Sequence, residues 1–474
     1  MSNLFSDLVT AGQALGVFQQ ALNTVQNNVT NANTPGFASQ SLNLVAQPFD
    51  VVGGLAGGVA SQGLKSARDE YADSEVQRQM STLGFYQAQA NGTNAITPNF
   101  DPSGNTGVPA ALTQFFQSVS GWSLTPNDAA AQQQVLAQAG NLAASVQSLA
   151  TSLSNTDQSM QSQIGNTVQQ VNSLTSQIQQ LNIQIIRQKS PDPGLDAQMH
   201  SALEQLSQLV DFSQIKQADG TETVVLSGGA ALVVGDQQFN LSMNAAVPAG
   251  SANPKAPPTV QILDSQGKDV SAQIQGGQLG GMLDVHNRIL ASILGDGQQA
   301  GSLNQFAKSL ADTVNGILTS GRVSVAAGAA NGTALFTYDN SDATLAAGTL
   351  ALNPNITTAG LAPVDSAGNS NGNALKLADL ANSTANGGVN GQTFAQFFGG
   401  IAQAVGNAAA TAANNQGSQQ QIVTQTEAQR DQISKVSLDE QAILLTQFQK
   451  SYEAAAKLIT VLNSVAETTI NMVQ

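Results

Sequence analysis

The sequence contains no cysteine and few charged or aromatic residues. Without cysteine, disulfide bonds and thiolate metal sites are excluded. Only 10% of the 474 residues are charged and 4% are aromatic, whereas about 25% of the residues in an ordinary soluble domain are charged. Much of the remaining polarity comes from neutral amides and hydroxyls. A neutral surface of this kind suits packing against further copies of the chain, because little charge is desolvated at each contact.

Basic residues are the scarcer of the two charge types. The chain has 31 acidic and 16 basic residues, which gives a net charge of −15. No basic cluster with interleaved aromatic residues occurs, although nucleic-acid binding depends on positive charge beside the phosphates. The sequence therefore predicts no nucleic-acid partner.

Residue patterns for catalysis and metal binding are missing as well. The two histidines, His200 and His286, have no second histidine three or four residues away, and His286 is expected on a polar helix face. Asp339, Asn340 and Asp342 resemble the start of a calcium loop, but the glycine at its turning point and the closing glutamate are absent. No nucleophile elbow or phosphate-binding loop occurs. We expect no catalytic, cofactor-binding or metal-binding residues, no cofactor and no enzymatic activity.

Long apolar runs and a basic amino-terminal segment are also lacking. The first basic residue is Lys65, and no run of 18 apolar residues occurs. A cleaved secretory peptide begins with positive charge and continues into an apolar stretch, and a membrane helix needs a still longer one. We therefore expect no membrane insertion and either a cytoplasmic protein or one exported without a cleaved signal peptide.

Both ends of the chain do carry apolar residues in alternating steps of three and four. Such spacing is typical of a coiled-coil seam, in which apolar residues face another helix. Two seams at opposite ends of the chain predict terminal helices that pair with each other or with neighbouring molecules. The candidate assembly-seam residues are Leu4, Leu8, Leu15, Phe18, Leu22, Val25, Leu438, Leu445, Phe448, Tyr452, Ile459 and Leu462, and the second series continues to Val473.

A turn motif follows the first helix. Proline fixes its own φ angle, and a following glycine can adopt positive φ, so the pair ends a helix and redirects the chain. The candidate turn residues are Asn31, Asn33, Thr34, Pro35, Gly36 and Phe37.

Helical and β-type patterns alternate through the rest of the chain. We expect a loosely extended segment over residues 38–64 and a linker over 91–110. A helix over 126–189 should begin with Thr125 as its N-cap and return as a second helix over 195–210. Strands are expected at 223–226, 231–234, 239–241, 260–263, 335–338 and 350–352, and helices at 279–319, 374–382 and 393–413. A glutamine-rich connection should lead to a final helix that begins with a capping box at Ser437.

The pattern predicts a mainly α fold with β insertions. We expect an elongated multi-domain rod with paired terminal coiled-coil helices, a long helical hairpin domain and a small outer β-rich domain. The expected division is a terminal domain of residues 1–37 and 437–474, a helical domain of residues 38–218, 276–320 and 374–436, and an outer domain of residues 219–275 and 321–373.

Several segments resemble one family in chain order. Residues 28–37 are similar to the motif after the first helix of bacterial flagellar rod, hook and hook-associated proteins. Residues 436–440, 448–449 and 452–457 resemble the C-terminal signature of the hook-associated proteins that join hook to filament, and 276–282 and 353–356 are weaker similarities. In one departure, the usual Tyr-Ser-Arg-Gln reads Phe37-Ala38-Ser39-Gln40, which lacks an arginine that could anchor a carboxylate.

The resemblance implies a structural role at the hook–filament junction, outside the cell, after type III export. It implies that the terminal helices form an inner layer around the export channel. The implied partners are other copies of the chain, the hook protein, the second hook-associated junction protein and an export chaperone at the C-terminal helix. The alternatives are another flagellar axial protein (the hook protein, the second junction protein or a flagellin-like protein) and a secreted coiled-coil adhesin or enzyme.

Overall fold

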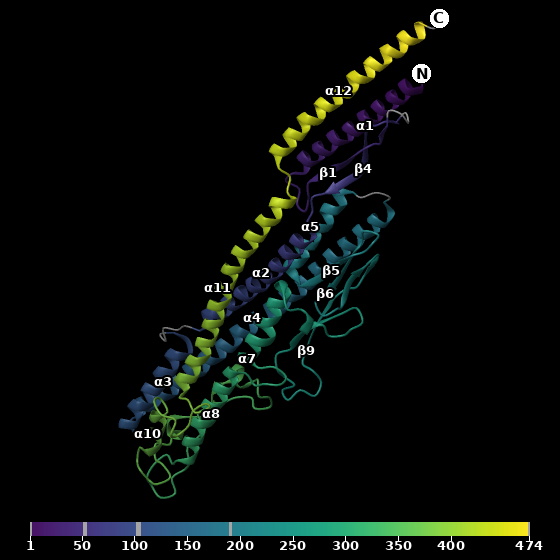
Figure 1. Cartoon of the computed structure of the whole chain (residues 1–474). Coiled ribbons are helices and arrows are strands. Elements are labelled where there is room, and N and C mark those ends of the chain that lie inside the picture. Colours follow the sequence, from purple (N-terminus) through teal and green to yellow (C-terminus); the bar gives the residue numbers. More distant parts are fainter. Residues whose placement is uncertain (1, 51–54, 101–105, 189–191, 473–474) are drawn as a thin grey trace.

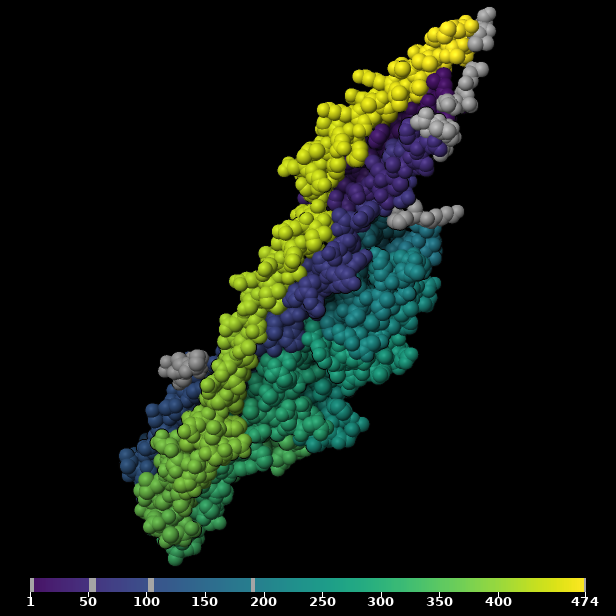
Figure 2. Space-filling model, in the orientation of Figure 1, coloured from purple at the N-terminus to yellow at the C-terminus, as the bar shows by residue number. Residues whose placement is uncertain are grey.

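The molecule is long and narrow, and both chain ends lie at one end of it (Figures 1 and 2). The computed structural model describes residues 2–50, 55–100, 106–188 and 192–472. Residues 51–54 of the expected extended segment, Lys189 at the expected end of the long helix and Val473 lie outside these residues. Helices dominate and the sheets are small and antiparallel, so the predicted fold class is confirmed.

The terminal helices pack against each other as predicted. Helix α1 (Ser2–Asn31) runs toward the middle of the molecule, and α12 (Leu438–Asn471) runs back beside it (Figure 1). The segment expected to be loose forms a hairpin that lies along α1. Its long strands are β1 (Gln40–Ala46) and β4 (Val59–Ser66), and the short strands β2 (Phe49–Asp50) and β3 (Leu55–Ala56) extend it.

Two further helices lie beside each other and lead away from the terminal pair. They are α2 (Glu70–Ile96) and α11 (Phe394–Ser434). Two expectations were wrong here. The predicted linker at 91–110 holds the end of α2, a 3-10 turn (Thr97–Asn99) and the start of α3 (Gly107–Leu124). The glutamine-rich connection is helical through Ser434, because glutamine is a good helix former and a sparse apolar face suffices against α2.

The longest helix, α4 (Ala129–Arg187), has 59 residues and is about 88 Å long at about 1.5 Å per residue. Its N-cap is Asp128, whose carboxylate accepts a hydrogen bond from the Ala130 amide at 2.8 Å, so the prediction of Thr125 was wrong. Pro126 lies in the preceding turn, where its carbonyl accepts a hydrogen bond from the Trp122 indole at 3.1 Å. Helix α5 (Pro193–Leu209) returns along α4, as predicted.

Short strands cover part of α4. A four-stranded antiparallel sheet contains β5 (Phe212–Lys216), β6 (Glu222–Leu226), β7 (Ala231–Val234) and β8 (Gln237–Gln238), in chain order. Strand β9 (Ser242–Ala246) pairs with β10 (Thr259–Leu263). Strand β5 was not expected, and the strand expected at 239–241 is the connection between β8 and β9.

The remaining elements fill the far half of the body. They are a 3-10 turn (Ser271–Gln273), α6 (Gly277–Asp284), a π-helical segment η3 (Val285–Leu290), α7 (Ala291–Leu294), α8 (Ser302–Ser320), β11 (Phe336–Thr337), α9 (Ala346–Thr349), β12 (Ala351–Leu352), a 3-10 turn (Thr358–Gly360) and α10 (Gly372–Asp379).

One hydrophobic core runs through the body, from the α4–α5 hairpin to the far end. At that far end it is aromatic: Phe306 contacts both Phe394 and Phe398, with ring centroids 6.1 and 5.5 Å apart. Among the described residues this core does not extend into the terminal pair, whose helices pack against each other, while α1 also packs against the hairpin. Among the described helices, none combines the length and apolar composition that a membrane crossing requires.

Candidate assembly interface

The candidate seam residues lie on α1 and α12, but the single chain buries few of them. Val25 is buried. Nine others are half-buried: Leu4, Leu8, Leu15, Phe18, Leu22, Phe448, Tyr452, Ile459 and Leu462. Leu445 is 37% exposed and Leu438 is 55% exposed. A seam that remains half open in one chain leaves apolar surface for a further molecule.

Small side chains occupy the fully covered positions instead. Ala11, Ala21 and Val17 are buried on α1, and Ala455 is buried on α12. Helix α1 contacts both α12 and the β1–β4 hairpin. The first helix is therefore covered on two sides, and small residues permit the close approach that this requires.

The opposite side of α12 is apolar and exposed. We call this surface the outer stripe; its residues are Ile443, Leu458, Val461, Val465 and Met472. Ile443 is 68% exposed and Met472 is 76% exposed. At 100° per residue these five side chains lie within about one-sixth of the helix circumference. An exposed apolar strip of this length is typical of a surface that another protein covers.

The turn motif joins α1 to the hairpin and docks on the body. The Asn31 carbonyl and side chain accept hydrogen bonds from the Thr34 amide and hydroxyl at 2.9 and 3.1 Å. Gly36 has a φ of +72°, and a Cβ atom there would overlap the backbone of α5 at Ala197. Asn33, Thr34 and Pro35 are exposed, and Phe37 is half-buried. The turn is thus shaped by the residues that the sequence singled out, and glycine is required where it touches α5.

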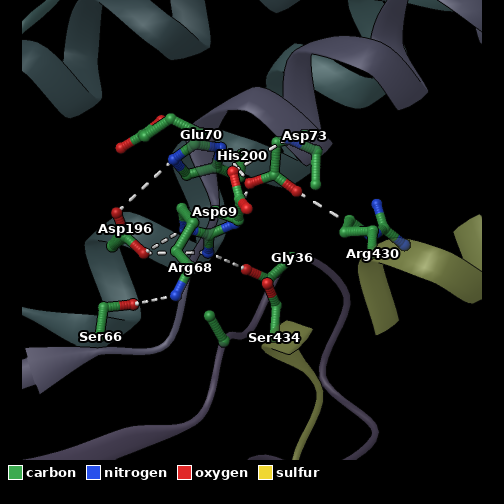
Figure 3. Close-up of polar contacts among 12 residues, drawn as sticks. Gly36, Ser66, Arg68, Asp69, Glu70, Asp73, Asp196, His200, Arg430 and Ser434 are labelled. Carbon is green, nitrogen blue, oxygen red and sulfur yellow. Dashed lines mark hydrogen bonds and ion pairs between the residues drawn. The ribbon is translucent and has the colours of Figure 1, made fainter. Parts of the chain in front are cut away.

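A buried arginine fixes this turn to the body. Arg68 precedes α2, and its side chain is 6% exposed. It donates hydrogen bonds to the Gly36 carbonyl at 2.6 Å, to Asp73 at 2.7 Å and to Asp196 on α5 at 3.0 Å (Figure 3). The turn motif itself lacks an arginine. Arg68, which follows the end of β4, supplies one at the same place. Sequence reasoning missed it, although an arginine just before a helix start with acidic residues was a possible signal.

Arg68 belongs to a larger group, the joint cluster, which comprises Arg68, Asp73, Asp196, His200 and Arg430. Arg430 comes from α11 and pairs with Glu204 on α5 at 3.0 Å, and its Nε lies 4.0 Å from Asp73. The cluster therefore connects three helices of the body to the hairpin, as the labelled side chains in Figure 3 show.

Burial sets the ionisation of the cluster. Burial raises the pKa of Asp73, although Arg68 and Arg430 act to lower it. Burial, followed by the nearby Arg68 charge, lowers the pKa of His200 to about 3. His200 is therefore neutral near pH 7, and its Nδ1, 3.4 Å from Asp73, makes no ion pair there. The attraction to Asp73 comes from the two arginines.

Backbone hydrogen bonds complete the joint. The Ser39 amide donates to the Ser434 carbonyl at 2.8 Å, and the Ala67 amide donates to the Ser39 carbonyl at 2.8 Å. The Ser434 hydroxyl donates to the Ala67 carbonyl at 3.3 Å. Three passages of the chain, from α1 to β1, from β4 to α2 and from α11 to α12, are therefore tied together at one place.

The second histidine lies elsewhere and is not on a polar face. His286 is 3% exposed, and its Nε2 lies 3.0 Å from Asp157 of α4, so the expectation of a surface position was wrong. It belongs to the π-helical segment η3, where a periodicity of 3.6 residues misplaces side chains. The neighbouring Asn287 exchanges hydrogen bonds with the Val260 backbone at 2.8 and 3.0 Å. This pair of residues ties β10 and α4 together.

The aspartates weighed as calcium ligands accept hydrogen bonds within their own loop and, at Asp342, from the connection between β9 and β10. Asp342 accepts hydrogen bonds from the Lys255 amide at 2.9 Å and from the Thr344 amide and hydroxyl at 2.9 and 2.7 Å. Asp339 accepts one from the Ser341 amide at 2.8 Å. In the parts of the chain that the structure describes, no three acidic or histidine side chains are grouped in a way that could hold a metal ion.

Comparisons with known proteins agree along the chain. A family model described as the flagellar hook-associated protein FlgK helical domain matches residues 96–336. A model of the flagellar basal body rod FlgEFG protein C-terminal region matches 427–472, and one of flagella basal body rod proteins matches 8–37. The two shorter matches cover the final helix and the first helix with its turn.

Curated relatives match over the full length. The chain is 25% identical to flagellar hook-associated protein 1 of Bacillus subtilis, over 99% of both chains. It is 24% identical to flagellar hook-associated protein 1 of Escherichia coli, over 100% of both. The solved structure of the flagellar hook junction protein FlgK from Burkholderia pseudomallei superposes with a TM-score of 0.60 at 20% identity, over 78% of this chain and 100% of that one.

Proposed function

The chain belongs to the flagellar hook-associated protein FlgK family of hook–filament junction proteins, and we propose that its paired terminal helices are the surface that joins it to the flagellum. It is an extracellular structural component of the flagellum, not an enzyme, and assembles with other axial components. On this proposal its neighbours are further copies of the chain, the hook protein on one side and the second hook-associated junction protein on the other.

The outer stripe of α12 carries the proposal. Five apolar side chains, between 45% and 76% exposed, lie along a helix that is at the edge of the molecule. Covering them in a polymer stabilises it by on the order of 5 kcal/mol per subunit, since a fully buried side chain of this type contributes about 1.5–3 kcal/mol. The half-open seam of α1 and α12 supplies further contacts.

The proposal also gives α12 a role before assembly and gives the turn a role in the shape of the subunit. An exposed apolar helix must be shielded before assembly, and we assign that task to an export chaperone that binds α12. We also assign the export of the chain to the type III route. The turn at residues 33–37, held by Gly36 and Arg68, sets the angle between the terminal pair and the body.

Charge placed on the outer stripe tests the proposal. In cells that produce the full-length V461E/V465E variant, we expect normal hooks, loss of filaments and release of unpolymerised flagellin. The reason is that two carboxylates would have to be desolvated in the contact. The control T446E/S464E adds the same charge at exposed positions beside the stripe and should keep its filaments. Normal incorporation of V461E/V465E on isolated hook–filament structures would refute the proposed surface.

A further inference from the structure

The terminal pair contains a buried amide contact that its apolar seam does not require. Asn28 is 1% exposed on α1, and Gln441 is 2% exposed on α12. The Asn28 Nδ2 donates to the Gln441 Oε1 at 2.9 Å and to the Gln40 carbonyl of β1 at 2.7 Å. The Gln40 amide donates back to the Asn28 Oδ1 at 2.9 Å. One asparagine therefore holds α1, β1 and α12 together.

The seam alone does not fix how far α1 is shifted along α12. Leu8, Leu15 and Leu22 repeat every seven residues on α1, and Leu438, Leu445, Tyr452 and Ile459 repeat likewise on α12. A slip by seven residues, about 10 Å, would again place apolar residues opposite apolar residues. The slip costs little apolar contact, so another interaction must select the observed register.

Charged side chains do not supply that interaction. Asp7 is the single charged residue of α1. Among the described residues, no ion pair connects α1 to α12, and the Asn28–Gln441 contact is the one hydrogen bond between side chains of the two helices. Many coiled coils use interhelical charge pairs, or one buried asparagine, to select register at some cost in stability. In the described part of this terminal pair no charge pair connects the helices, and the buried asparagine is present.

We propose that Asn28 and Gln441 are positioning residues that select the axial register of the terminal pair. A slip by seven residues that brings Ala21 opposite Ala455 would place Asn28 opposite Phe448 and Gln441 beyond the end of α1, so the bond between the two amides is lost, and an unpaired buried polar group costs about 1–3 kcal/mol. This inference deepens the proposed function, because a fixed register gives every subunit the same outer stripe. It concerns the pairing within one chain, however, and can be tested apart from assembly.

Engineered cysteines can report the register, because the chain has none of its own. In an antiparallel pair, Ala14 and Ala455 lie two heptads from Asn28 and Gln441, and are therefore opposite each other in the observed register. Ala21 and Ala455 would be opposite after a slip by seven residues. In the purified full-length chain we expect oxidation to cross-link A14C/A455C at least about tenfold faster than A21C/A455C.

Removal of the amides should abolish this preference. In the N28L/Q441L background the ratio of the two cross-linking rates should fall to within about threefold of one. Q441L alone retains both bonds between Asn28 and Gln40 and should lower the ratio in part. The control N27L/Q449L changes the same residue types at exposed positions and should keep the full preference.

Several outcomes would overturn the inference. An unchanged preference in both N28L/Q441L and Q441L would show that the backbone bonds at the joint set the register alone. Loss of both cross-links in these variants would assign the amides to pairing itself rather than to register. Failure of A14C/A455C to cross-link in the parent chain would reject the register. The cross-linking rates are measured on the purified chain and do not depend on incorporation into flagella. A negative result here is therefore distinguishable from a negative result with V461E/V465E, which tests the outer stripe.

Discussion

Glu222 is a buried carboxylate near the joint with an incomplete set of partners. It is 2% exposed on β6, and its Oε2 accepts no hydrogen bond. Burial raises its pKa from 4.5 to about 7, with smaller contributions from Glu70 and Asp196, while Lys216 opposes the shift. The Lys216 ammonium pairs with Glu70 at 2.7 Å instead. The folded state therefore holds a proton on Glu222 more tightly than the unfolded state does.

This difference makes stability depend on pH. Between about pH 4.5 and about pH 7 the folded chain binds more protons at Glu222, so this residue's contribution to stability decreases as pH rises. The full effect is at most about 3 kcal/mol. We expect E222Q to raise the melting temperature at about pH 8 and to leave it nearly unchanged at about pH 4.5.

Thermal unfolding of the full chain at both pH values checks this expectation. E453Q, at an exposed position of α12, removes an equivalent charge and should change neither melting temperature by more than about 1 °C. An equal gain for E222Q at both pH values would contradict the pKa argument. His200 acts in the opposite direction, since its lowered pKa costs stability as pH falls from about 6.5 toward 3. Because His200 is present in every variant, its effect on the melting temperature cancels when variants are compared at one pH.

Residue chemistry could be predicted where it is local. Pro35 and Gly36 indicate a turn by their backbone preferences alone, and Gly36 does adopt positive φ. The contacts of Asn28 and Gln441, and those of Arg68 beyond the nearby Asp73, could not be found in this way, because these partners are between 12 and 413 residues distant and the tertiary fold brings them together. Asn28 and Gln441 are also polar residues among apolar ones. The apolar series of the heptad pattern does not include them, so the pattern gave no sign of their contact.

Helices and strands could be predicted to the extent that their patterns were strong. Helix α4 combines a continuous buried stripe with a clear stop, and α5 begins at a proline after an aspartate cap, so both were found. The second half of α11 was missed because few of its residues, among them Gln419 and Val423, are buried. Strand β5 was missed because a single edge strand with a mixed burial pattern carries a weak signal.

The connection between elements at the joint can be weakened by one substitution. R68M removes the cation nearest to Asp73 and the donor to the Gly36 carbonyl. We expect a loss of about 3–5 kcal/mol in the free energy of unfolding, because a buried carboxylate loses most of its compensation. Chemical denaturation of the full chain measures this loss.

A matched arginine provides the control. Arg78 is 71% exposed and pairs with Glu75 on the surface of α2, so R78M should cost no more than about 1 kcal/mol. R68M/D73N removes the buried charge as well and should recover part of the loss. Equal effects of R68M and R78M would mean that the joint cluster contributes no more than a surface ion pair.

Charged side chains are scarce in the amino-terminal part of the molecule, whereas α12 carries six: Asp439, Glu440, Lys450, Glu453, Lys457 and Glu467. Residues 1–64 include just two charged side chains, Asp7 and Asp50. Contacts made through this region bury apolar and amide groups, which salt screens little. We expect attachment of the purified chain to isolated hooks to change less than about threefold between about 0.05 M and about 0.5 M sodium chloride.

Co-sedimentation with hooks across a salt series measures this dependence. A loss of more than about tenfold over the same range would show that attachment depends on charged residues of the body instead. The outer-stripe variant V461E/V465E should bind weakly at every salt concentration, which separates a loss of apolar contact from a change in screening.

The joint brings together, between the terminal pair and the body, the chain passages that connect them. The peptide between β9 and β10, by contrast, lies on the body and is remote in sequence from both termini (Figure 1). A foreign epitope or a small fluorescent domain spliced there would interrupt neither α1 nor α12. A change of length in that outer loop therefore leaves the joint and the helices of the terminal pair in place.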